Sequence, residues 1–315
     1  MATPKPQISA GHFIVGQVAR QTISVCARNL ISDTPPRWIN KYMAFTVAPQ
    51  GIDVLKKHIC ALMPSWTDAV IKDFKYLSGG YSNENYSFSM SSDKGTENFV
   101  FRLPKVQQPF VNRDLELQWY LTLPDNVGVK PVALDVKSGA MITPMLDGQI
   151  LAEVYDDHFG ERELLDYVKN LHLVLPNVER EYNMFELAAL YAVDPAGLPS
   201  QDSMHMYQAC HNDLNPWNII VTEHGWRTID WEFVGLNDPL FDLVALHQGL
   251  ELPDAGLVNL SAQLIGHTDV DRLSRVQKTF WYREWAWADF QMRAGNLREE
   301  IISQHKLSQA KLSEL

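Results

Sequence analysis

The order of extended and helical segments is the feature that most constrains how this chain of 315 residues folds. Three short β-type runs, at 74–77, 86–90 and 98–103, follow one another with Gly- and Asn-containing turns between them. Such a series is typical of an antiparallel meander. A helical segment at 112–123 comes next, and two further strand candidates follow it, at 129–136 and 140–143. The first half is therefore predicted to form five strands with one inserted helix.

Helical patterns dominate from Ile150 onward, where apolar residues recur three and four positions apart. The predicted helices are 161–173, 183–192, 239–249 and 271–293. Two short apolar runs, at 218–222 and 226–229, lie on either side of His224-Gly225. Strands in the first half and helices in the second half predict an α+β fold, with the joint at 143–148.

The length favours two domains, or two lobes that share a site. We expect an N-lobe at 51–145, which begins with a helix at 51–63, and a mostly helical C-lobe at 146–315. Residues 1–50 show no clear period and are assigned as an N-terminal extension, with a break at Pro35-Pro36.

The composition excludes several function classes. A net charge of −11 and a pI of about 5.3 argue against a nucleic-acid binder and against docking on an anionic membrane. No run of about 18 apolar residues predicts a transmembrane helix, and the first ten residues lack the apolar core of a signal peptide. The three cysteines do not have the spacing of a disulfide framework or a zinc site, which favours a cytoplasmic protein.

The strongest motif is the run from His211 to Asn218. Asp213 is followed five residues later by Asn218, and Asp230 comes twelve residues after that, at the end of a short apolar run. This is the pattern of a kinase catalytic loop followed by a magnesium-binding aspartate. Asn218 and Asp230 offer the hard oxygen ligands that Mg²⁺ prefers, and Asp213 is placed to accept the proton of an attacking hydroxyl.

A plainer interpretation is available for each residue of this motif. Asp213 and its neighbours are common turn formers, and Asp230 would then be an exposed loop end. The spacing of Asp213 and Asn218 is weak evidence by itself. The preceding His211, the predicted hairpin and the following Asp230 supply the context that the motif requires, so phosphoryl transfer from ATP is the favoured interpretation.

The first half contains the partners that such a site needs. A loop at 78–85 joins the first two strands, where Gly80 allows close approach to phosphates and Ser82 and Asn83 can add donors. Arg102, on the third strand, is predicted to contact phosphates while Glu116 of the following helix holds it. The alternatives are an ordinary hairpin turn, a surface arginine and a solvated glutamate.

Three residues near the motif are assigned supporting roles. Glu232, two residues after Asp230, is a second carboxylate near the metal site or the acceptor. Asp242 can brace the catalytic loop from the first turn of a helix. His211 is assigned to bracing the loop rather than to proton transfer, because kinase chemistry gives that task to the aspartate.

Aromatic residues suggest a cationic acceptor. The segment 280–290 is dense in aromatic and acidic residues, and Trp281 and Trp285 lie at helical spacing. Together with Trp231 they are candidates for the wall of a pocket that binds a quaternary ammonium or thiazolium group. The alternative is that the aromatic stripe on this late helix belongs to the core.

The order and spacing of these motifs resemble the choline kinase and aminoglycoside phosphotransferase superfamily, most closely its bacterial LicA-type choline kinases and its thiamine kinases. The resemblance covers about residues 77–246. The segments that carry it are Gly79 to Asn83, Phe101-Arg102, Arg113 to Glu116, Leu171-His172, His211 to Asp213, Asn218 to Ile220, Ile229 to Glu232 and Asp242-Leu243.

The resemblance implies a bilobal, protein-kinase-like fold with ATP and Mg²⁺ between the lobes. It implies hydrogen bonds from the hinge backbone to adenine, for which Thr143 and Met145 are the candidates. It also implies Asp213 as the base and Asn218 and Asp230 as the metal ligands. The Asn212 between His211 and Asp213 is similar to choline kinases, whereas Trp217 stands where those enzymes usually have glycine.

The predicted function is therefore transfer of the γ-phosphoryl group to the hydroxyl of a small alcohol, with choline preferred. Thiamine, ethanolamine and aminoglycosides are alternative acceptors of the same reaction. A non-catalytic, nucleotide-binding pseudokinase is the alternative from a different class. A homodimer is a further possibility that the sequence leaves open.

Overall fold

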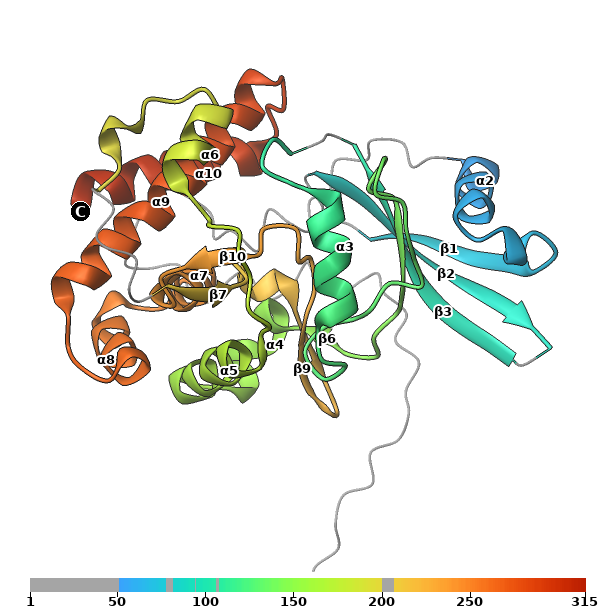
Figure 1. The fold of residues 1–315 in the computed structure, drawn as a ribbon, viewed down its shortest axis with the longest axis horizontal. Coiled ribbons are helices and arrows are strands. Elements are labelled where there is room, and N and C mark those ends of the chain that lie inside the picture. Colours follow the sequence, from blue (N-terminus) through green and yellow to red (C-terminus); the bar gives the residue numbers. More distant parts are fainter. Residues whose placement is uncertain (1–50, 78–81, 94, 106–107, 200–206) are drawn as a thin grey trace, which may run out of the picture. The chain divides into compact units, whose positions relative to one another are not determined.

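The computed structural model describes residues 51–77, 82–93, 95–105, 108–199 and 207–315 (Figure 1). These residues fall within one compact unit, Pro36–Leu315. The predicted extension at 1–50 and the predicted phosphate-loop residue Gly80 lie outside the described residues. The division into lobes at 145/146 stays a prediction.

The first half forms the predicted five-stranded antiparallel sheet, with the strand order β1-β2-β3-β5-β4. Its strands are β1 (Val70–Leu77), β2 (Asn83–Ser92), β3 (Gly95–Pro104), β4 (Ala133–Leu134) and β5 (Met141–Pro144). Only the first three make a simple meander. The strand predicted at 129–136 is reduced to two residues at the sheet edge, because β5 occupies the place beside β3.

Alternation of large apolar side chains gives the sheet one buried face. Phe88 on β2 and Phe101 on β3 are among the buried residues of this face, and their exposed fractions are 1% and 0%. The predicted helix at 51–63 is present as α2 (Ile52–Leu62), which places Leu55 and Ile59 in the same core. A short helical turn, η1 (Pro64–Trp66), leads from α2 toward β1.

The helix α3 (Arg113–Thr122) connects the two halves of the molecule (Figure 1). The side chain of Asn112 accepts hydrogen bonds from the backbone N–H groups of Asp114 and Leu115, which caps the first turn. Farther along the helix, Trp119 and Tyr120 are buried in the large core of the second half. The first turn of α3, with Arg113 and Glu116, is thereby fixed next to the catalytic loop.

The second half is mostly helical, as predicted. Its helices are α4 (Leu151–His158), α5 (Glu161–Val174), α6 (Met184–Leu190), α7 (Leu240–Gly249), α8 (Asp254–Ile265), α9 (Val270–Arg293) and α10 (Glu299–Glu314), with the short turns η2 (Pro195–Gly197) and η3 (Pro216–Asn218). The predictions for α5, α6, α7 and α9 are confirmed, whereas α4, α8 and α10 were not predicted individually.

Two small sheets hold the segments that carry the motif. One consists of β6 (Gln149–Ile150), β8 (Ile219–Thr222) and β9 (Gly225–Thr228), and the other of β7 (Gln208–Cys210) and β10 (Gly235–Asn237). The hairpin β8–β9 matches the two predicted apolar runs around His224-Gly225. Strand β7 ends at the buried Cys210, directly before His211, so the catalytic loop begins in the core.

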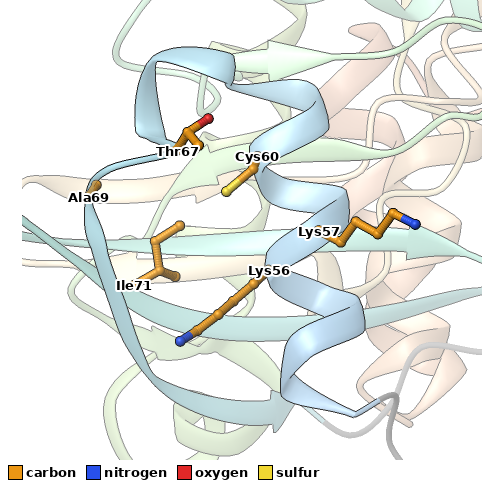
Figure 2. A pocket seen from close by; sticks show the side chains of 6 residues that line it. All are labelled: Lys56, Lys57, Cys60, Thr67, Ala69 and Ile71. Atoms are coloured by element: carbon orange, nitrogen blue, oxygen red, sulfur yellow. The ribbon is translucent and has the colours of Figure 1, made fainter.

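Within the described residues, no helix is long and apolar enough to cross a membrane. A pocket lies between α2 and β1, lined by Lys56, Lys57, Cys60, Thr67, Ala69 and Ile71 (Figure 2). None of the residues predicted to carry the chemistry lines this pocket, so it is separate from the site described next.

Candidate active site

The catalytic loop is held by one buried carboxylate at the start of α7. Asp242 accepts hydrogen bonds from the backbone N–H groups of His211 (2.9 Å) and Asn212 (2.8 Å) and from the His172 ring (2.9 Å). Burial alone raises the pKa of Asp242, but the hydrogen bond and charge of His172 and the contacts from His211 outweigh it and lower the pKa. A charged Asp242 therefore fixes the backbone on the N-terminal side of Asp213.

His211 is a neutral bracing residue in the structure. Its Nδ1 accepts a hydrogen bond from the backbone N–H of Asp213 (3.2 Å), and its Nε2 lies 3.2 Å from the carbonyl oxygen of Ile229. The second contact requires Nε2 to carry the proton. Burial lowers the pKa of His211, which keeps the ring neutral. Both ring nitrogens of His211 are therefore hydrogen-bonded, Nδ1 within the catalytic loop and Nε2 to the residue directly before Asp230.

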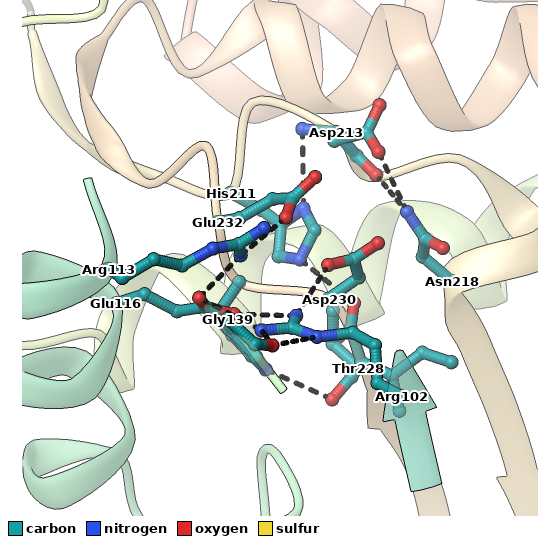
Figure 3. Close-up of polar contacts among 12 residues, drawn as sticks. Arg102, Arg113, Glu116, Gly139, His211, Asp213, Asn218, Thr228, Asp230 and Glu232 are labelled. Carbon is teal, nitrogen blue, oxygen red and sulfur yellow. Dashed lines mark hydrogen bonds and ion pairs between the residues drawn. The ribbon is translucent and has the colours of Figure 1, made fainter. Parts of the chain in front are cut away.

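Asp213 is oriented from two sides. The Asn218 amide group donates hydrogen bonds to the Asp213 carboxylate (2.9 Å) and to its carbonyl oxygen (3.0 Å). The Arg283 guanidinium donates to Asp213 Oδ1 (2.9 Å) and to the carbonyl oxygen of Asn212 (2.8 Å). Since Asn218 uses its NH₂ group on Asp213, its Oδ1 is directed elsewhere, as Figure 3 shows.

Asn212 links the catalytic loop to the segment after Asp230. Its Nδ2 donates to the carbonyl oxygens of Phe233 (3.0 Å) and Gly235 (3.2 Å), and its Oδ1 accepts from the amide of Asn237 (2.8 Å). Asn212 is fully buried and has a φ of +63°, a conformation that asparagine tolerates better than most residues. These contacts give a structural reason for an asparagine between His211 and Asp213.

Three carboxylates gather beside the catalytic loop. Oxygens of Glu116, Asp230 and Glu232 lie within 4.8 Å of one another (Figure 3). Burial, and then the Glu232 charge, raise the pKa of Asp230, while Arg102 opposes the shift. Asp230 Oδ1 is buried and accepts no hydrogen bond within the described part of the chain, although Arg102 lies 3.5 Å from it. This oxygen therefore has capacity for a cation.

Two arginines neutralise part of this acidic group. Arg102 on β3 makes a two-pronged ion pair with Glu116, at 2.7 and 3.1 Å, as expected from the sequence. Arg113, in the first turn of α3, contacts Glu116 (2.6 Å) and Glu232 (2.7 Å). Burial lowers the pKa of Arg102, but Glu116 outweighs burial and the net direction is upward. Both guanidinium groups therefore stay charged.

Gly139, at the turn before β5, makes room for these arginines. Its carbonyl oxygen accepts hydrogen bonds from Arg102 Nε (3.3 Å) and Nη2 (3.2 Å). Its φ is +76°, and a Cβ at this position would lie 2.7 Å from the Arg113 side chain. A glycine is required here for both conformation and space.

The predicted phosphate-covering segment is described from Ser82 onward. The Ser82 hydroxyl accepts a hydrogen bond from the Gln108 amide (2.8 Å), which ties the start of β2 to the segment before α3. Asn83 is 5% exposed, and its Oδ1 accepts no hydrogen bond from the described residues. Asn83 is therefore the first residue of β2, and Ser82 directly precedes it, next to the segment where Gly80 was predicted to contact phosphates.

Of the two predicted hinge residues, Thr143 lies on β5 and Met145 directly follows this strand. Thr143 pairs with Val100 across β3 and β5. The backbone N–H of Met145 donates to the carbonyl oxygen of Asn98 (2.9 Å), which extends the ladder by one residue. The Met145 N–H is therefore occupied by the sheet, and adenine recognition through it would require this bond to open.

The structure contradicts the predicted aromatic wall. Trp231 is fully buried, its indole N–H donates to the carbonyl oxygen of Thr228 (3.1 Å), and its ring packs against His211. Trp281 is 2% exposed and packs in the core against Phe280. Trp285 contacts Tyr282 and His305 of α10 rather than the catalytic loop. The stripe on α9 is core because α9 packs against both α7 and α10.

Sequence reasoning gave no role to Arg113 and Arg283, yet each contacts two groups of the site. Both residues lie in segments rich in charge, where arginines are usually solvent-exposed. Glu116 lies only three residues from Arg113. The other contacts, of Arg113 with Glu232 and of Arg283 with Asp213, join residues 119 and 70 positions apart, so spacing along the chain does not indicate them.

Comparisons with known proteins agree with this geometry. Residues 156–273 match a family model described as the phosphotransferase enzyme family. Protein LicA of Haemophilus influenzae is 24% identical over 228 residues, a match that spans 64% of this chain and 64% of that protein. The chain thus spans less than two thirds of the length of this curated relative.

Solved structures share the fold at low sequence identity. A choline/ethanolamine kinase family protein from Mesorhizobium loti superposes with a TM-score of 0.64 at 17% identity, over 83% of this chain and 93% of that protein. A LicA structure in complex with AMP gives a TM-score of 0.64 at 16% identity, over 83% and 98% of the two chains. The predicted resemblance is therefore confirmed: residues 156–273 are similar to the phosphotransferase enzyme family, and the chain has the kinase-like fold of the choline/ethanolamine kinase and LicA structures.

Proposed function

We propose that this chain transfers the γ-phosphoryl group of ATP to the hydroxyl of a small alcohol, with choline as the preferred acceptor. The observation that carries the proposal is the arrangement around Asp213. Its carboxylate is fixed by Asn218 and Arg283, and it follows a loop that Asp242 and His211 hold in place. Such rigid positioning is what a kinase contributes to a reaction that needs little covalent chemistry from the protein.

Asp213 is proposed to accept the proton of the acceptor hydroxyl. Its side chain is 18% exposed, so it is within reach of a bound molecule. Arg283 and Asn218 hold the carboxylate in one orientation. The proton therefore moves from the hydroxyl to a carboxylate oxygen while the oxygen of the alcohol attacks phosphorus.

The residues present fit a magnesium ion. Asp230 has a buried oxygen without a hydrogen-bond donor among the described residues, and the Asn218 amide oxygen is left over by its contacts to Asp213. Asp230 and Asn218 would hold the ion, and Glu232 lies beside them. Mg²⁺, when bound, offsets the negative charge of the nucleotide phosphates. Arg102 is proposed to contact the same phosphates, since Glu116 fixes its guanidinium 3.5 Å from Asp230.

The choice of acceptor rests on two supports. The curated relatives that match are described as Protein LicA, and one similar structure is described as a choline/ethanolamine kinase family protein. The buried acids Glu232 and Glu284 also pair with Arg113 and Arg283, so these two arginines add no net positive charge that would repel a cationic alcohol. Ethanolamine and thiamine satisfy the same chemistry, and an aminoglycoside is a larger acceptor of the same kind. A dimer and a cytoplasmic location stay predictions.

The test is an assay of ADP release with Mg²⁺ and ATP against choline, ethanolamine, thiamine and an aminoglycoside. Turnover with a cationic alcohol is the expected result. Asp213→Ala should lower kcat by about 10²- to 10⁴-fold and leave ATP binding intact. The matched control is Asp166→Ala, a 57% exposed acid on α5, which should behave as wild type.

Two outcomes would overturn parts of the proposal. Nucleotide binding without turnover of any alcohol would favour a non-catalytic pseudokinase. Turnover by Asp213→Ala close to that of wild type would remove the proton-acceptor role.

For the metal site, Asp230→Ala should abolish turnover and weaken Mg²⁺-dependent binding of ATP, measured by calorimetry with and without the ion.

A further inference from the structure

An aromatic cluster that the sequence did not predict lies beside the catalytic loop. It consists of Phe110, Tyr182 and Phe233, whose ring centroids are 5.2 to 6.5 Å apart. Phe110 and Phe233 are nearly parallel, and Tyr182 meets both by an edge. Phe110 and Phe233 come from the segments before α3 and after Glu232, so the cluster joins both halves of the molecule.

Three observations connect this cluster to the proposed acceptor site. The Asn212 side chain donates a hydrogen bond to the carbonyl oxygen of Phe233 (3.0 Å). Phe233 directly follows Glu232, which pairs with Arg113. The backbone N–H of Tyr182 donates to the carbonyl oxygen of Leu236 (2.9 Å), and Glu181 pairs with the same residue, so Tyr182 is fixed beside the segment that follows Glu232.

One ring of this cluster is already covered by a cation of the protein. The Arg180 guanidinium carbon lies 3.6 Å from the centroid of the Phe110 ring, and Nη2 donates to the Phe110 carbonyl oxygen (2.6 Å). Among the described residues, no carboxylate lies within 4 Å of Arg180. Burial lowers the pKa of this guanidinium, and Tyr182 and Glu186 act against that effect. Arg180 is thus held by one ring face and one backbone carbonyl.

We propose that the Phe110 ring binds the cationic group of the acceptor, and that Arg180 is a specificity-determining residue because its guanidinium covers this ring and must be displaced when such an alcohol binds. The inference rests on the proposed function. One ring face accommodates one cation, so the acceptor and Arg180 compete for Phe110. Arg180 therefore lowers the affinity for cationic acceptors and selects those that bind strongly enough to displace it.

The contacts of Arg180 make the displacement feasible. Arg102, Arg113 and Arg283 each pair with carboxylates, and moving any of them would leave buried acids without a partner. A displaced Arg180 would lose the hydrogen bond to the Phe110 carbonyl oxygen and the cation–π contact with the Phe110 ring. Glu186 in the first turn of α6 is exposed and already acts on Arg180 at longer range, so it offers a partner for the displaced guanidinium.

The test compares wild type, Arg180→Gln, Phe110→Leu and the double variant. With choline as acceptor, Arg180→Gln should lower KM by about fivefold to tenfold, the range expected from removal of one partly desolvated cation–π competitor. The effect should fall on the KM of choline rather than on the KM of ATP. In the Phe110→Leu background the same substitution should have almost no effect, because the shared ring face is gone.

A matched control separates this effect from general loss of positive charge. Arg162→Gln removes an 89% exposed arginine on α5 and should leave the KM of choline unchanged. Arg180→Ala replaces Arg180→Gln if the latter does not fold. An unchanged or higher KM in the Arg180 variant overturns the proposal. An equal fall in KM with and without Phe110 also overturns it, since charge repulsion alone would then explain the effect.

Calorimetric titration with choline measures binding without turnover, so it tests this inference independently of the proposed function. If wild type turns over no alcohol, the proposed function fails, but tighter choline binding by Arg180→Gln than by wild type still supports competition at Phe110. If neither protein binds choline, or both bind it equally, the inference fails. If wild type turns over choline and the Arg180 variant has the same KM, only the inference fails.

Discussion

Replacing Asp242 by asparagine tests how the catalytic loop is held. Asp242 is fully buried and uses both carboxylate oxygens: Oδ1 for the N–H of Asn212, and Oδ2 for the N–H of His211 and the ring of His172. Asparagine has the same shape but replaces one oxygen by an NH₂ group. Whichever way the amide turns, a donor then faces a donor in a buried place.

The magnitude follows from these contacts. One buried backbone N–H loses its acceptor, which costs about 1–3 kcal/mol, and the remaining hydrogen bonds lose the contribution of the negative charge, about 1 kcal/mol. We therefore expect Asp242→Asn to lower the free energy of unfolding by about 2–4 kcal/mol and Tm by roughly 5–10 °C. A shift of the loop by about 1 Å would also lower kcat by up to about 10²-fold.

The assay is urea unfolding followed by circular dichroism, together with turnover by the folded variant. The pKa of Asp242 is lowered in the folded state, so its contribution is complete above the ordinary pKa near 3.8 and is lost only as the pH falls further. Measurements at pH 7 therefore report the full effect. Asp166→Asn, on the exposed face of α5, is the control and should change stability by less than about 0.5 kcal/mol. A similarly small change for Asp242→Asn, with unchanged kcat, would refute the reasoning.

Three further predictions concern the arginine contacts, the buried histidine and the corrected aromatic wall. Gly139→Ala should lower the free energy of unfolding by about 1–2 kcal/mol from the positive φ alone, and should lower kcat further because the new Cβ displaces Arg113; equal stability and activity in unfolding and turnover assays would contradict this. Burial lowers the pKa of His211, so the unfolded state binds a proton first as the pH falls below about 6.5, and wild-type stability should decrease there and recover as the pH rises. His211→Gln should show a smaller slope of unfolding free energy between pH 7.5 and 5.5, and an unchanged slope would rule out His211 as a source. Trp281→Ala should cost about 3–5 kcal/mol as a core cavity, whereas Trp281→Phe should keep the KM of the acceptor; a raised KM in a stable Trp281→Phe protein would restore Trp281 to the acceptor site.

Hydrophobic periodicity predicted those elements whose buried faces are apolar. Phe99 and Phe101 are buried, and Asn98 and Val100 beside them are exposed and half-buried, so β3 could be located from the sequence. Helix α10 was missed because two of its three buried residues, Gln304 and Ser308, are polar. The Gln304 amide donates a hydrogen bond to Glu284 of α9, and a buried polar contact of this kind does not appear as an apolar period in the sequence.

The aromatic prediction went wrong for a related reason. Helical spacing placed Trp281 and Trp285 on neighbouring turns of one helix, and this was correct. Spacing does not say what covers that face of the helix. In the structure α7 lies on one side of α9 and α10 on another, so the aromatic stripe is covered by protein. The cluster beside the catalytic loop comes instead from Phe110, Tyr182 and Phe233, which are separated by long stretches of chain.

The sequence by itself determined the local features of this protein. The five strands, the hairpin after the catalytic loop and the spacing of Asp213, Asn218 and Asp230 all depend on residues close together in the chain. Backbone conformation and turn chemistry over such short distances are set largely by the local residues.

Only the tertiary structure decided which distant charges meet. Arg113 pairs with Glu232, and Arg283 reaches Asp213 from α9, across separations of 119 and 70 residues. Arg180 covers the ring of Phe110, which lies 70 residues before it in the chain. A buried ion pair forms only where packing removes water from both partners, and packing depends on the whole fold rather than on neighbours in sequence.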